Sequence, residues 1–192
     1  MSDLTELGFG LLLGFTLTVP PGPMNALIAA RSAMSFRRGF LTGLGAMSAD
    51  LVLGTAVYLL QSQVDLSEVV RYIYALGAIV MAYLGVRLLT APPPEAPGEP
   101  AGLRTYSSGL LVGLSNPFQI LWWLTAGIAF AYLGGVVLLV GLFGAIAIWV
   151  VGFSWAMHAG VHLHPRLPRA VTVVSAAILL GFAVYFAVLA AV

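Results

Sequence analysis

The sequence contains no cysteine and no lysine, and it has few charged residues of any kind. The lack of cysteine excludes disulfide bonds, thiolate metal sites and thiol redox chemistry. Charged residues make up 8% of the 192 residues and hydrophobic residues 60%, whereas soluble domains carry roughly 25% charged residues. The eight basic residues form no stripe that could follow a phosphate backbone, so we expect no nucleic-acid partner. This composition predicts an integral membrane protein in contact with the lipid bilayer.

The hydrophobic segments predict an all-α, polytopic membrane protein. At about 20 apolar residues per membrane crossing, the chain accommodates six transmembrane helices, near residues 6–30, 39–60, 70–90, 106–131, 135–157 and 170–191. Residues 91–104 are rich in proline and predict a linker on the cytoplasmic side. This linker separates two three-helix units, 1–90 and 105–192, which we expect to form one transmembrane domain.

Seven of the eight arginines fall in or beside loops on one side of the six predicted helices, and only Arg71 falls on the other. The positive-inside rule makes the arginine-rich side cytoplasmic. Both termini are therefore expected outside, in a protein of the cytoplasmic (plasma) membrane. Asp3 and Glu6 stand where a signal peptide would need positive charge, so we expect no cleavage.

Parts of the sequence recur at an offset of 99 residues. The matching segments are Gly10–Phe15 with Gly109–Leu114, Gly45–Ala46 with Gly144–Ala145, and Gly77–Ile79 with Ala176–Ile178. Because each unit holds three spans, the two copies must cross the membrane in opposite orientations. This is the inverted-repeat architecture of many secondary carriers.

Two breaks interrupt the predicted first and fourth helices. The first consists of Pro20, Pro21, Gly22 and Pro23, and the second of Asn116 and Pro117. Broken helices persist inside a membrane where they line a cavity, and in transporters they form the binding site. Each restarted helix is expected to expose unpaired amide N–H groups that attract an anion such as a carboxylate. The alternative is a pair of ordinary proline kinks.

Asp50 is the one ionisable residue near the centre of a predicted span. An aspartate at a helix centre costs about 3 kcal/mol on insertion, so we expect it to face the bundle interior or water. At the 99-residue offset its counterpart is Trp149. We interpret Asp50 as a proton carrier or as the partner of a substrate ammonium group, and a purely structural hydrogen-bonded aspartate is the alternative. Small residues at helical spacing share its face: Gly39, Gly43, Ala46 and Gly54.

Asn25 and Gln119 are polar residues beside the two breaks, and we include them in the expected substrate-binding and translocation site. His158, His162 and His164 could hold a metal, but a polar loop at the membrane interface explains them better. The sequence shows no nucleophile–base pair, no carboxylate pair and no phosphate-binding loop. We therefore expect no enzyme activity, no cofactor and no metal site.

Several residues together match a family pattern: Pro20–Asn25, Arg38–Gly39, Gly43, Gly45, Asp50, Ala82–Gly85 and Asn116–Pro117. Over nearly the whole chain they resemble the lysine-exporter-type amino-acid efflux family. The resemblance implies a six-helix secondary transporter that exports amino acids or related small metabolites in exchange for protons. It assigns the two proline breaks to the binding site and Asp50 to the ionisable centre. Ala49 departs from the family pattern, which has glycine before the aspartate.

Two other functions remain as alternatives. A metal-cation exporter of related fold is the first, although one central acidic residue and no cysteine argue against it. A membrane assembly subunit without transport activity is the second, but such a subunit has no need of two broken helices. The sequence leaves open which amino acid is carried, the coupling stoichiometry and the formation of a homo-oligomer.

Overall fold

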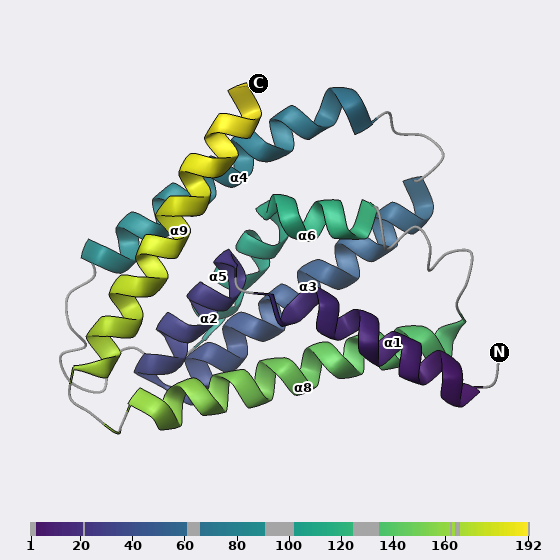
Figure 1. Ribbon diagram of the computed structural model, residues 1–192, viewed down its shortest axis with the longest axis horizontal. Coiled ribbons are helices and arrows are strands. Elements are labelled where there is room, and N and C mark those ends of the chain that lie inside the picture. Colours follow the sequence, from purple (N-terminus) through teal and green to yellow (C-terminus); the bar gives the residue numbers. More distant parts are fainter. Residues whose placement is uncertain are drawn as a thin grey trace.

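The computed structural model describes residues 3–20, 22–60, 66–90, 102–124, 135–161, 163 and 166–191, and all regular structure within these ranges is helical (Figure 1). The helices are α1 (Asp3–Thr18), α2 (Pro23–Met34), α3 (Phe36–Leu60), α4 (Leu66–Thr90), α5 (Leu103–Ser115), α6 (Pro117–Trp122), α8 (Val136–Val161) and α9 (Leu167–Ala191). The predicted all-helical fold is confirmed.

Three of the described helices are long and apolar enough to cross a bilayer, within Phe36–Leu59, Val136–Val161 and Arg169–Ala191. A fourth candidate is the pair α1 and α2, which meet at an angle of 79° across the proline break. In α4 the apolar part is the shorter segment Tyr74–Arg87. These spans make the chain an integral membrane protein.

Both predicted breaks are present, and both follow from local chain chemistry. Helix α1 ends at Thr18, and α2 begins at Pro23, after Gly22 in an extended conformation. The N–H group at the first position of any helix has no partner within the helix. Proline, which lacks this group, therefore suits that position. Helix α5 ends at Ser115, and α6 begins directly after Asn116, again with a proline at its first position.

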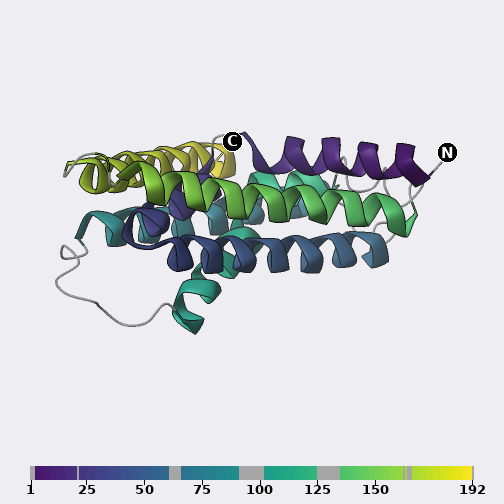
Figure 2. The ribbon, with the colours of Figure 1, turned by 90° about the horizontal axis from the view of Figure 1, so that it is seen from below.

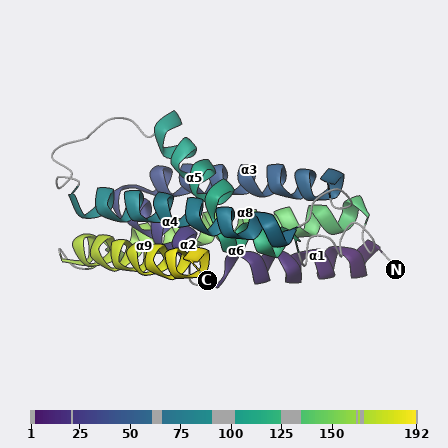
Figure 3. The same ribbon diagram turned by 90° about the horizontal axis from the view of Figure 1, so that it is seen from above.

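The helices pack most extensively as three pairs: α4 with α9, α1 with α8, and α3 with α5. Helices α1 and α9 lie on one side of the molecule, and α3 and α5 lie on the other (Figures 2 and 3). One buried cluster joins α2, α4 and α9 around Leu27, Met81 and Phe186. A second joins α3 and α8 around Val57 and Leu142. Residues beside the breaks belong to these clusters or pack against them, with Met24 and Ala26 in the first and Leu17 and Trp123 in the second.

Glycines let the helices of two pairs touch through their backbones. A Cβ atom on Gly141 of α8 would collide with the Leu7 carbonyl oxygen of α1. In the same way, a Cβ atom on Gly45 of α3 would collide with the Tyr106 carbonyl oxygen of α5. Leu7 and Tyr106 are 99 positions apart, as the repeat predicts, but Gly45 and Gly141 are 96 apart. Residues of α3 and α8 that make corresponding contacts therefore lie 96 positions apart, three fewer than the predicted offset of 99.

This shift changes the counterpart of Asp50. Ala49 and Ala145, which are also 96 positions apart, each lie against a glycine of the partner helix. In the register that these contacts define, the residue equivalent to Asp50 is Ile146. This register differs from the sequence-based one, which pairs Asp50 with Trp149 at the offset of 99.

We expect Gly109→Ala to lower the free energy of unfolding by about 1–3 kcal/mol, because an overpacked contact costs that much. The added methyl group would collide with the Thr42 carbonyl oxygen. Gly144→Ala is the matched control, since a Cβ atom there meets nothing within 4 Å. Thermal unfolding of both variants in detergent measures the difference, and equal midpoints would contradict this account of the packing.

Candidate functional site

A cavity of about 400 Å³ lies where the two broken helices meet α3 and α8. Most of the predicted site residues line it: Pro20, Gly22, Pro23, Asn25, Asp50, Asn116 and Gln119. Pro117 does not line it and instead packs, fully buried, where a Cβ atom on Gly77 of α4 would lie. Pro21 lies outside the described residues. The structure thus brings residues from both breaks to one cavity.

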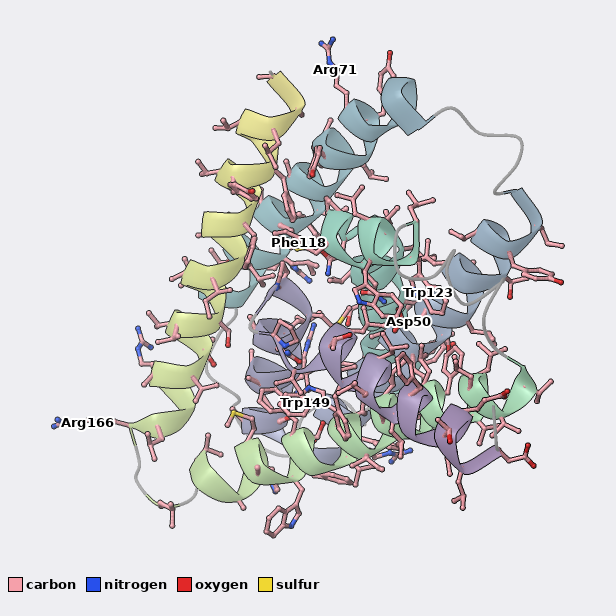
Figure 4. All side chains as sticks on the ribbon, turned by 45° about the vertical axis from the view of Figure 1, so that its right-hand side comes forward. Asp50, Arg71, Phe118, Trp123, Trp149 and Arg166 are labelled. Carbon is pink, nitrogen blue, oxygen red and sulfur yellow. The ribbon has the colours of Figure 1, made fainter. Side chains whose placement is uncertain are left out.

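Asp50 lies in the wall of this cavity and is only 3% exposed. Its Oδ1 atom accepts two hydrogen bonds of 2.8 Å, from Gln119 Nε2 and from Trp123 Nε1. Figure 4 shows Asp50 beside Trp123 in the interior of the bundle. A buried polar group needs such bonds, since burial without them costs several kcal/mol. No hydrogen bond to Oδ2 is formed by the part of the chain that the structure describes.

Asn25 connects the first break to α8. Its Nδ2 atom donates to the carbonyl oxygens of Thr18 at 2.7 Å and Pro20 at 2.9 Å. These carbonyls lie where α1 has ended, so no helical N–H group is there to satisfy them. Asn25 Oδ1 accepts a 3.1 Å bond from Trp149 Nε1. One side chain therefore satisfies the broken backbone and fixes the indole that lines the cavity.

Asn25 and Gln119 occupy equivalent places in the two restarted helices. Each is the third residue of its helix, after Pro23 and Pro117 respectively. Each side chain bonds to a residue of a long helix, Gln119 to Asp50 on α3 and Asn25 to Trp149 on α8. The local fold after each proline thus delivers an amide side chain to the cavity.

The two helix starts differ in their free donors. No side chain caps the start of α2, so the N–H groups of Met24 and Asn25 keep the unpaired state of a first helical turn. At the start of α6, Asn116 Oδ1 accepts a bond from the N–H group of Phe118 at 3.2 Å. The prediction that both restarts expose unpaired donors is therefore wrong in part, because Asn116 uses its own oxygen to satisfy one of them.

The hydrogen bonds of Trp123 with Asp50 and of Trp149 with Asn25 were not predicted from the sequence. Sequence spacing alone cannot pair them with Asp50 and Asn25, which lie far away in the chain. A usable signal does exist: an indole N–H group buried in a membrane protein needs an acceptor, and the chain offers few acceptors at this depth.

Other polar residues near the site bond to their own helices. Thr16, Thr18, Ser48 and Ser115 each donate to a carbonyl oxygen three or four residues earlier. Ser48 also accepts a 2.7 Å bond from the Tyr106 hydroxyl group, which joins α3 to α5. Apart from Ser48, these hydroxyl groups connect no two helices.

The histidine cluster is only partly described. His158 Nδ1 lies 3.1 Å from the Ser32 carbonyl oxygen, while His162 and His164 lie outside the described residues. Within the described ranges, no group of three histidine, aspartate or glutamate residues is arranged to hold a metal ion.

Comparison with known proteins decides the family. The model of the LysE type translocator family matches residues 15–190. The chain belongs to this family. A similar protein is the Bacillus subtilis (strain 168) protein named "Putative amino acid efflux protein YcgF", which is 32% identical over an aligned region that covers 92% of each chain. No solved structure matches the chain. The resemblance inferred from the sequence is confirmed, and the chain is a membrane translocator of small molecules, in a family of transporters and not of enzymes.

We expect Asn25→Leu to lower the free energy of unfolding by about 2 kcal/mol or more. The substitution removes three hydrogen bonds, each worth about 1 kcal/mol, and leaves two carbonyl groups without a donor. Trp149→Phe removes only one of the three bonds and keeps an aromatic ring, so we expect a loss of about 1 kcal/mol. Thermal unfolding in detergent measures both. An equal loss in the two variants would show that the bonds to Thr18 and Pro20 contribute nothing.

Proposed function

We propose that this translocator exports amino acids from the cytoplasm in exchange for protons, and that Asp50 binds the substrate ammonium group and the proton alternately. The observation that carries the proposal is the place of Asp50, the one charged residue among the described residues that line the cavity. Its Oδ1 atom is held by Gln119 and Trp123, which leaves Oδ2 as the oxygen for a ligand. The name of the Bacillus subtilis relative supports amino acids as the substrate class.

The substrate carboxylate would bind at the start of α2. The N–H groups of Met24 and Asn25 carry the partial positive charge of a helix N-terminus. Asn116 lines the same cavity and has a side-chain NH₂ group that donates to no described residue. The site would thus offer donors for a carboxylate and one carboxylate for an ammonium group, which is the charge pattern of an α-amino acid.

The same proposal includes six spans arranged as an inverted repeat. One repeat would contain α1, α2, α3 and α4, and the other would contain α5, α6, α8 and α9. Matching glycine contacts in the α1–α8 and α3–α5 pairs support this relation, as do the equivalent bonds of Asn25 and Gln119.

We propose an orientation in the plasma membrane with both termini outside the cell. Arg71 lies at the end of the molecule that holds the C-terminus, and Arg166 lies at the opposite end of α9 (Figure 4). Six further arginines share the loops or helix ends of the Arg166 side in the predicted topology. The positive-inside rule places that side in the cytoplasm.

Exchange of one proton for one zwitterion would carry one positive charge inward for each amino acid exported. A charge that crosses 100 mV contributes roughly 2.3 kcal/mol, so the membrane potential would drive export together with the proton gradient. A metal-cation substrate fits less well, because the described cavity wall offers one carboxylate where a cation site gathers several oxygen or nitrogen ligands.

We expect Asp50→Asn to abolish efflux driven by a pH gradient while the protein remains folded. The variant keeps an acceptor for Gln119 and Trp123 but cannot carry a proton or neutralise an ammonium group. The assay uses purified protein in liposomes loaded with labelled amino acids, with Asp3→Asn on the exposed start of α1 as the matched control. Gradient-driven release by Asp50→Asn with an unchanged pH dependence would refute the proton role.

A further inference from the structure

The walls of the cavity restrict which amino acids fit it. We infer that the site selects amino acids with uncharged, apolar side chains, and that it discriminates against basic, acidic and strongly polar ones. This inference rests on the proposed function, because it takes the cavity as the amino-acid site. It goes further in naming the class of side chain.

Each charged group of the substrate backbone has a partner in the proposed site, the ammonium group at Asp50 and the carboxylate at the N–H groups that begin α2. Among the described residues that line it, Asp50 is the one charged group, and the ammonium group of a zwitterion neutralises it. A second ammonium group on the substrate side chain would find no second carboxylate, and a side-chain carboxylate would find no cation. An unpaired charge in an apolar enclosure is strongly unfavourable, so the site disfavours both kinds of side chain.

The polar groups of the wall are largely occupied within the protein. The hydroxyl groups of Thr16 and Thr18 donate to carbonyl oxygens of their own helix. Asn25 Nδ2 donates to two carbonyl oxygens at the first break, and Gln119 Nε2 donates to Asp50. With Asn116 assigned to the substrate carboxylate, few donors remain for a polar side chain.

The rest of the wall is apolar and partly aromatic. Phe118 and Phe182 form an edge-to-face pair with ring centroids 5.3 Å apart, and both line the cavity. Ile28 and Val150 line it as well. A volume of about 400 Å³ lies at the small end of the range for ligand pockets, roughly 300–1,000 Å³. This wall suits one branched or aromatic side chain and not a peptide.

Ile146 on α8 occupies a position in the cavity wall where a second carboxylate could lie. In the register of the glycine contacts, Ile146 on α8 is the counterpart of Asp50 on α3, and both line the cavity. A carboxylate at Ile146 would make the site doubly acidic, which is the charge needed for a substrate with two ammonium groups. With isoleucine at this position, the described wall carries one carboxylate and suits a neutral side chain.

The first test measures competition in the wild-type protein. Liposomes that contain the purified protein exchange labelled leucine across the membrane, and unlabelled leucine, phenylalanine, methionine, serine, lysine or aspartate is added as competitor. We expect the three apolar amino acids to compete roughly tenfold or more better than the other three. Equal competition by lysine, aspartate or serine would overturn the inference.

Exchange measured with each of these six amino acids labelled in turn separates this inference from the proposed function. Exchange of lysine, aspartate or serine without exchange of any apolar amino acid would overturn the selectivity and leave amino-acid export intact. If folded protein exchanged no amino acid of any class, both the selectivity and the proposed function would fall.

The second test changes the charge at α8. We expect Ile146→Asp to improve competition by lysine relative to leucine by about tenfold or more, while the uncharged control Ile146→Asn gives no such gain. A folded Ile146→Asp protein without the gain, or an equal gain in both variants, would overturn the role of Ile146. If Ile146→Asp does not fold, the carboxylate is placed instead at Val150, which lines the cavity one helical turn later, and the same comparison is made with Val150→Asn.

Discussion

The structure depends on two hydrogen bonds that reach Asp50 from beyond the second break. A carboxylate in the middle of a membrane protein is costly unless donors surround it. Gln119 and Trp123 supply these donors at 2.8 Å, and both follow the restart at Pro117. The break in the fourth predicted helix is thus needed for the carboxylate in the second.

The first break shows the same dependence with different partners. A chain that leaves its helix inside a membrane has carbonyl groups that water cannot satisfy. Asn25 satisfies two of them and accepts a bond from Trp149, which ties α2 to α8. The same arrangement therefore occurs at both breaks: an amide side chain from the restarted helix bonds to a residue of a long helix. They differ in charge, because Gln119 bonds to the carboxylate of Asp50 on α3, whereas Asn25 bonds to the uncharged indole of Trp149 on α8. We propose that this difference, one charge in a site of approximate two-fold symmetry, decides what the protein carries.

Much of the fold could be predicted from the sequence, because hydropathy and proline act locally. The spans within α3, α8 and α9 follow from apolar length, and both breaks follow from prolines that cannot continue a helix. Asp50 was expected in the interior because lipid excludes it, and the structure buries it. Seven of the nine predicted site residues line one cavity for the same reason, since polar groups at a break must face one another and not lipid. The prediction failed for Pro117, which packs against α4 and away from the cavity.

The contacts between helices could not be predicted in the same way. A shift of three residues keeps nearly the same helix face, so apolar sequence matches cannot distinguish an offset of 99 from one of 96. The close contacts between helices, such as those of Gly45 and Gly141, reveal the offset of 96. The bonds of Trp123 and Trp149 depend on how the helices rotate and approach, which hydropathy does not record. The hydrogen bond by which Asn116 caps α6 was not predicted. An asparagine before a helix can either accept a bond from an N–H group of the first turn or bind a ligand, and the sequence does not distinguish the two.

Infrared difference spectroscopy would test the central proposal, that the proton and the substrate compete for Asp50, most directly. The measurement follows the carbonyl stretch of a protonated carboxyl group in the purified protein as leucine is added at low pH, with Asp50→Asn used to assign the band. Our account predicts a band that belongs to Asp50 and disappears when leucine binds, because the ammonium group displaces the proton. An Asp50 band that remains unchanged in the substrate-bound protein would contradict it.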